Sequence, residues 1–222
     1  EVEEEIDGLE TVEPAFGLPA IWIAEDDRER AQIAGYTVVD IPTIISTHLT
    51  EVIKVQSLEF IGRQEVQKLM DKVSENEPKI VEELIPDLLG LGTIQRVLQN
   101  LLRENVSVRD MKTILETLAD ISQYTKLPDV LTEHVREALA RNISRQYQTD
   151  DGVIPLMTLD QDIENQIAES IQETPQGSYL GVDPESAQAI ITAIDTSIET
   201  FSMFNYQPLL LCPPVVRPHL KK

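Results

Sequence analysis

Residues 94–102 read IQRVLQNLL and carry the clearest structural signal in the chain. Their apolar members recur at intervals of three and four positions: Ile94, Val97, Leu98, Leu101 and Leu102. This spacing places the apolar side chains on one face of an α-helix. The same spacing recurs in residues 109–119, RDMKTILETLA, after a polar turn at 104–107. The two stretches therefore predict a pair of amphipathic helices that face one core.

The helical pattern continues on both sides of this pair, from Arg63 to about Tyr147. An apolar stripe over residues 80–89 contains Pro86, which predicts a kink or a split because proline lacks an amide hydrogen. Ser107 and Asp110 are expected to form a capping box before the second helix. We therefore expect an all-helical subdomain over residues 62–140.

The first 40 residues predict a small β-α-β unit. Leu18–Ile23 and Tyr36–Val39 are rich in β-branched and aromatic residues, which is typical of strands. Residues 25–34 lie between them and begin with three acids, which suit the first turn of a helix.

A separate helix is expected over residues 41–61. Asp40 can cap its start, and Pro42 is tolerated in a first turn. One face of this helix is apolar: Ile45, Leu49, Val52 and Ile53.

Residues 141–222 predict a partial α/β subdomain. The expected strands cover 153–159 and 209–212, and the expected helices cover 160–172 and 183–203. We expect a loop at 173–182, because it holds proline and two glycines. The predicted fold class is α+β and predominantly helical.

The chain is strongly acidic, with 39 acidic and 18 basic residues and a formal charge of −21. Twelve acids and two arginines fall within the first 40 residues, which therefore carry −10 of this charge. Such a surface repels nucleic-acid phosphates and favours basic protein partners, or serves solubility alone. A helical nucleic-acid-binding regulator that uses a helix-turn-helix at 93–120 is the alternative function, although acids oppose Arg109 and Lys112 there.

The sequence shows no catalytic constellation, so we expect no enzyme activity, no metal and no cofactor. The three histidines lack neighbouring ligands at zinc-site spacing, and phosphate-binding and serine-hydrolase motifs do not occur. Cys212 follows a predicted strand, which leaves a nucleophile open in principle. A buried structural thiol is the better interpretation, because no base or oxyanion glycine lies nearby in sequence.

One loop, residues 13–19 (EPAFGLP), places Phe16 among prolines and a glycine. Two interpretations follow from the residues. Phe16 packs onto the core, or it is an aromatic anchor beside an apolar docking pocket rimmed by acids.

Five blocks follow one another along the chain: 13–23 (EPAFGLPAIWI), 35–49 (GYTVVDIPTIISTHL), 62–65 (GRQE), 97–104 (VLQNLLRE) and 109–119 (RDMKTILETLA). Together they resemble the cytoplasmic domain of the FlhA family, the export-gate proteins of the flagellar type III secretion system. Export gates of virulence-associated type III secretion are relatives. Because the blocks occur in order along the whole chain, the resemblance is far more specific than a short motif.

The resemblance implies a fragment of a bacterial inner-membrane protein whose cytoplasmic domain has four subdomains and forms a nine-membered ring. It assigns residues 1–40 to the second subdomain, 41–61 to a helix of the first, 62–140 to the third and 141–222 to part of the fourth. It further implies a non-enzymatic platform for export chaperones that carry flagellin or filament cap protein, and for other components of the export apparatus.

The resemblance also implies a chaperone-binding dimple. Its acidic residue, phenylalanine and threonine correspond to Glu13, Phe16 and Thr47, and Val39 and Ile44 are expected to supply its wall. The acid is often aspartate in relatives, so Glu13 keeps the charge and changes the reach.

Overall fold

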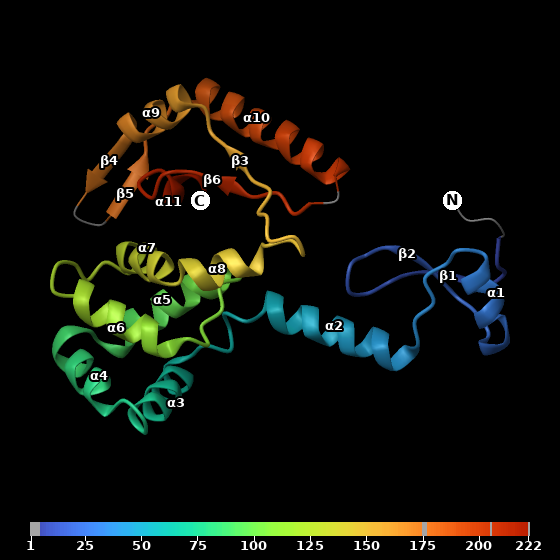
Figure 1. Cartoon of the computed structure of the whole chain (residues 1–222), viewed down its shortest axis with the longest axis horizontal. Coiled ribbons are helices and arrows are strands. Elements are labelled where there is room, and N and C mark those ends of the chain that lie inside the picture. Colours follow the sequence, from blue (N-terminus) through green and yellow to red (C-terminus); the bar gives the residue numbers. More distant parts are fainter. Residues whose placement is uncertain (1–4, 175–176, 205, 222) are drawn as a thin grey trace. The chain divides into compact units, whose positions relative to one another are not determined.

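The computed structural model describes residues 5–174, 177–204 and 206–221 (Figure 1). The chain forms two compact units that divide between Phe60 and Ile61. The finer division into four subdomains stays a prediction. Within the described ranges, no helix combines the length and the apolar character needed to cross a bilayer.

The first unit consists of a β-hairpin followed by helices. Strands β1 (Leu9–Val12) and β2 (Pro19–Trp22) pair antiparallel, with Leu9 opposite Trp22. The remaining elements are η1 (Glu25–Asp27), α1 (Arg28–Ile33) and α2 (Ile41–Val55). A small core holds the hairpin and α1 together: Ile6, Ala31 and Ala34 are buried, with Ile23, Tyr36 and Val38 packed against them.

The expected β-α-β order is wrong, because both strands of this unit precede the helix in the sequence. Residues 36–39 pair with no strand among the described residues. Burial does alternate along these four residues, since Tyr36 and Val38 pack on the small core while Thr37 and Val39 are exposed. An extended segment lying on a core produces the same two-residue period as a strand. The true partner of β2 is β1, which the acidic character of the first residues obscured.

Helix α2 begins as predicted and ends earlier than predicted. The backbone N–H of Thr43 donates to the Asp40 carboxylate at 2.9 Å, so Asp40 is its N-cap. The helix ends at Val55, and turns continue to Phe60. No residue of α2 is buried, and its apolar face is exposed: Ile45, Leu49, Val52 and Ile53.

The second unit contains the predicted helical subdomain. Its helices are α3 (Arg63–Ser74), α4 (Pro78–Glu83), α5 (Leu91–Arg103), α6 (Met111–Ile121), α7 (Pro128–Ala138) and α8 (Ala140–Gln146). They enclose one hydrophobic core, to which α5 and α6 contribute the faces predicted from their spacing. Ile94, Leu98 and Leu115 are fully buried there.

Two local predictions in this subdomain need adjustment. The stripe over 80–89 breaks at Ile85, inside the short π-helical turn η2 (Leu84–Leu88). Ile85 adopts an extended conformation, as steric contact with a following proline favours. The capping box is wrong: Asp110 itself is the N-cap of α6 and accepts hydrogen bonds from the N–H and hydroxyl of Thr113, at 3.2 and 2.9 Å.

The rest of the second unit is an α/β region. Its elements are β3 (Met157–Thr158), α9 (Gln161–Glu169), β4 (Ile171–Thr174), β5 (Gly177–Leu180), α10 (Pro184–Met203), β6 (Leu210–Leu211) and α11 (Arg217–Leu220). Strands β3 and β6 pair in parallel (Figure 1), and α9 and α10 lie between them in the sequence. Together with the helical subdomain and the first unit, this region confirms the predicted class, α+β and predominantly helical.

The loop predicted at 173–182 is wrong where it is described. Strands β4 and β5 form a hairpin, with Ile171 opposite Leu180. Residues 175 and 176 lie outside the described residues. Gly177 is therefore the first residue of a strand rather than part of an open loop. Helix α9 ends three residues before the predicted Gln172.

Candidate docking site

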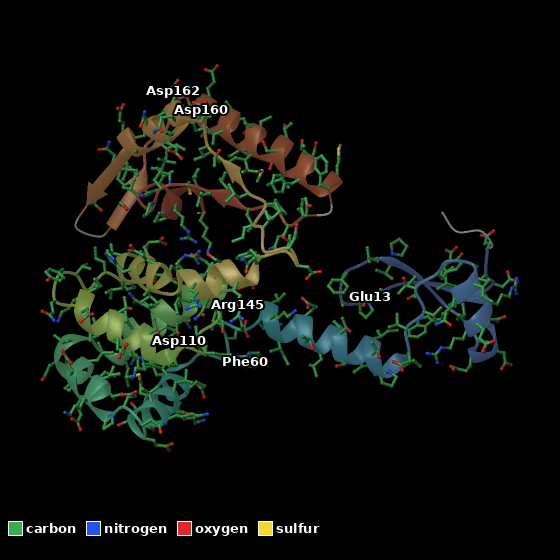
Figure 2. All side chains as sticks on the ribbon, in the orientation of Figure 1. Glu13, Phe60, Asp110, Arg145, Asp160 and Asp162 are labelled. Atoms are coloured by element: carbon green, nitrogen blue, oxygen red, sulfur yellow. The ribbon has the colours of Figure 1, made fainter. Side chains whose placement is uncertain are left out.

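The loop between β1 and β2 is held by its own hydrogen bonds. The carboxylate of Glu13, a residue labelled in Figure 2, accepts from the N–H of Ala15 at 2.9 Å and from the N–H of Phe16 at 2.7 Å. The Glu13 N–H donates to the Leu18 carbonyl at 2.8 Å, and the Gly17 N–H donates to the Glu13 carbonyl at 2.9 Å. Gly17 has a φ of +69°, which glycine adopts without strain. The loop is therefore a closed turn built around Glu13.

This turn presents Phe16 to solvent. The Phe16 side chain is 63% exposed, and Leu18 beside it is 59% exposed. The structure thus answers one question that the residues left open, because Phe16 does not pack into the core of its unit. A rigid turn that displays a large apolar side chain loses little conformational entropy when a partner covers it.

A pocket of about 920 Å3 lies in the same unit. Side chains of β2, of the extended segment at 36–39 and of the first turn of α2 line it. Its apolar walls include Ile21, Trp22, Tyr36, Val39 and Ile44. The volume falls within the usual range of ligand pockets. Of these wall residues, Tyr36 also packs against the small core of the unit.

Carboxylates dominate the charge of the pocket lining. Glu10, Glu13, Glu25 and Asp40 contribute to it, against one base, Arg28. Arg28 lies 3.4 Å from Glu25 and offsets that charge. Hydrogen bonds from the side chain and then the backbone of Thr43 lower the pKa of Asp40, so this carboxylate is ionised at neutral pH. The lining therefore favours a partner with both apolar and basic groups.

The structure brings three of the five predicted site residues into one pocket lining. Glu13, Val39 and Ile44 line it, whereas Phe16 and Thr47 do not. Phe16 belongs to the turn that Glu13 organises, and Thr47 is a half-exposed residue one turn beyond Ile44 on α2. Their shared role as one docking site stays a prediction.

Sequence reasoning missed Trp22 and Tyr36 as pocket residues. Trp22 is 43% exposed although it lies in a strand. It is the single tryptophan of the chain and closely follows the Pro/Gly-rich loop, which is a signal that could have identified it. Aromatic residues with large, partly exposed surfaces are enriched at protein interfaces.

The alternative helix-turn-helix corresponds to α5 and α6. One face of α6 is buried in the helical core, and Lys112 on that helix is 2.5 Å from Glu77.

Across the described part of the chain, no group of three His, Cys, Asp or Glu side chains is placed to hold one metal ion. Burial raises the pKa of the half-buried Cys212 thiol, which disfavours the reactive thiolate at neutral pH.

The chain is similar in sequence to flagellar proteins from distant bacteria. It is 43% identical over 217 residues to the flagellar biosynthesis protein FlhA of Bacillus subtilis, which covers 98% of this chain and 32% of that protein. It is 40% identical over 215 residues to FlhA of Salmonella typhimurium, covering 97% and 30%. The chain therefore spans about a third of the length of these relatives.

Solved structures give the same result at the level of the fold. The Chlamydia pneumoniae CdsV protein superposes with a TM-score of 0.82 at 30% identity, covering 96% of this chain and 61% of that one. A nonameric EPEC SctV-C, determined by cryo-EM, has a TM-score of 0.69 at 32% identity, covering 88% and 60%. The family model described as FHIPEP matches residues 1–222. Because this match extends over the whole chain, the chain belongs to the FHIPEP family.

Proposed function

We propose that this chain is a non-enzymatic docking platform of a flagellar type III export gate, on the cytoplasmic side of the bacterial inner membrane. Its partners are export chaperones with bound substrates of the flagellin and filament-cap type, together with other export components. The FlhA relatives support the flagellar assignment. A CdsV–CdsO complex among the similar structures supports docking of secretion components on this fold.

We also propose that the parent protein assembles as a nine-membered ring. The support is the nonameric assembly of two structural relatives, EPEC SctV-C and the EscV cytosolic domain. The latter has a TM-score of 0.64 at 34% identity, covering 80% of this chain and 53% of that one.

The observation that carries the docking proposal is the exposed Phe16 on a turn pinned by Glu13. The acid-rimmed pocket in the same unit adds a second apolar surface. Together they suit a chaperone surface that presents apolar side chains next to lysine or arginine. No comparable observation favours the nucleic-acid alternative, since Lys112 of α6 is already paired.

The test is a calorimetric titration of a flagellar export chaperone–substrate complex into the chain. Phe16→Ala should weaken binding by about 2 kcal/mol or more, roughly thirtyfold, because it removes an apolar anchor. Phe60→Ala is the matched control, because Phe60 is also a largely exposed phenylalanine, at 55%, and does not line the pocket (Figure 2). Equal affinities for wild type and Phe16→Ala would remove Phe16 from the docking site.

A further inference from the structure

Five charged side chains join the end of the chain to the helical subdomain. Glu104, at the end of α5, lies 2.5 Å from Arg136 and 2.6 Å from Lys221, and it also accepts a hydrogen bond from Arg217. A second Arg217 nitrogen donates to Glu133 of α7 at 2.6 Å. The side chains are 11 to 36% exposed, so water screens these contacts less than it screens surface ion pairs.

Few apolar side chains are buried beyond the helical core. The large hydrophobic core extends no further along the described chain than Ile143. Among later residues whose burial is described, only Ile167 and Val216 are buried apolar side chains. Residues 213–221 therefore contribute one buried apolar side chain, Val216, beside their charged contacts to Glu104 and Glu133.

The charges of this cluster are unequal, since three cations face two carboxylates. Burial, and then the neighbouring Arg217, lower the pKa of Arg136. Burial, with Arg103 adding to it, lowers the pKa of Lys221 to about 8. Both shifts show that burial and neighbouring cations disfavour the charged forms of Arg136 and Lys221. The short distances to Glu104 are the contacts that favour the charged forms.

We propose that this cluster is a releasable latch, centred on Glu104, that holds residues 213–221 against the helical subdomain. Glu104 is central because three cations share its carboxylate. Its removal leaves three cations with one carboxylate, whereas removal of Arg136 leaves two cations with two carboxylates. Loss of Glu104 should therefore open the latch more than loss of Arg136.

The test is hydrogen exchange of the whole chain, followed by mass spectrometry. Glu104→Gln should speed exchange in residues 213–221 by about tenfold or more, and leave α6 unchanged. The glutamine keeps the helix end, because the cap there uses the backbone N–H of Glu104. Glu116→Gln, on the exposed face of α6, is the matched control and should change nothing.

Two further measurements separate a latch from general destabilisation. Raising the ionic strength from about 0.1 to about 1 M shortens the Debye length from about 10 to about 3 Å. Because the cluster is only partly exposed, salt should open the wild type in part, and it should have less effect on Glu104→Gln. Labelling of Cys212, the single thiol, should accelerate in Glu104→Gln.

Three outcomes would overturn the latch. The first is unchanged exchange of residues 213–221 in Glu104→Gln. The second is faster exchange that extends equally through α5 and α6, which would show that Glu104 supports the helical core instead. The third is an effect of Arg136→Met as large as that of Glu104→Gln, which would contradict the charge balance.

Discussion

Replacing Glu13 should loosen the turn that displays Phe16. The Glu13 carboxylate accepts two backbone hydrogen bonds, at 2.9 and 2.7 Å. Hydrogen bonds to charged groups contribute about 1.5–3 kcal/mol, and we take about 1 kcal/mol each because the turn is largely solvated. Glu13→Ala should therefore lower the free energy of opening the turn by about 2 kcal/mol, roughly thirtyfold in the opening equilibrium. Glu13→Gln keeps one acceptor oxygen and should lose about half of this free energy.

Amide hydrogen exchange measured by NMR tests this prediction without a partner. The amides of Ala15 and Phe16 should exchange about thirtyfold faster in Glu13→Ala. Glu10→Ala is the control, because Glu10 also lines the pocket but lies on β1. Unchanged exchange of Ala15 and Phe16 would refute the role of Glu13 in the turn.

The same variants separate two roles of Glu13 in docking. If Glu13 acts through the turn, Glu13→Ala weakens chaperone binding equally at low and high salt. If Glu13 is a charge partner, the loss shrinks as salt screens the interaction. The hydrogen bonds to Ala15 and Phe16 favour the first result.

Two other predictions concern the scaffold. Leu98→Ala, at a fully buried position of α5, should lower the free energy of unfolding by about 3 kcal/mol in urea denaturation, and an equal midpoint and slope for wild type and variant would contradict the assigned core. The lowered pKa of Asp40 means that its capping contribution is present above its unfolded pKa and is lost as pH falls through the folded value. The midpoint temperatures of thermal unfolding of Asp40→Asn and wild type should therefore differ at pH 7 and become equal in acid. A difference that persists in acid would contradict a stabilising role of the Asp40 carboxylate.

The helical subdomain could be predicted because its information is local. The apolar spacing in 94–102 states which face of α5 is buried, and the same holds for 109–119. Asp40 could also be identified as a cap, because a cap bonds to the residue three positions later. The prediction of a capping box at Ser107 was wrong because Ser107 and Asp110 are both possible capping residues within one turn. The backbone conformation makes Asp110 the N-cap of α6.

Strands were harder to predict because each depends on a distant or unpatterned partner. Residues 36–39 show a strand period without a described partner, and Leu9–Val12 form a strand within an acidic stretch. The candidate site shares this difficulty. The resemblance placed Glu13, Val39 and Ile44 in one dimple, yet neither composition nor spacing could reveal that the Glu13 carboxylate bonds its own turn.

By itself, the sequence determined the acidic character, the amphipathic helices and the Pro/Gly-rich loop around Phe16, since composition and short-range spacing record these directly. The exposure of Phe16 came from the structure. Only the tertiary structure decided the β1–β2 pairing, the walls of the pocket and the contact of Glu104 with Arg217, which lies 113 residues later. The physical reason is that an ion pair or a pocket wall depends on where the chain returns in space. Helical periodicity, by contrast, is set within a few turns.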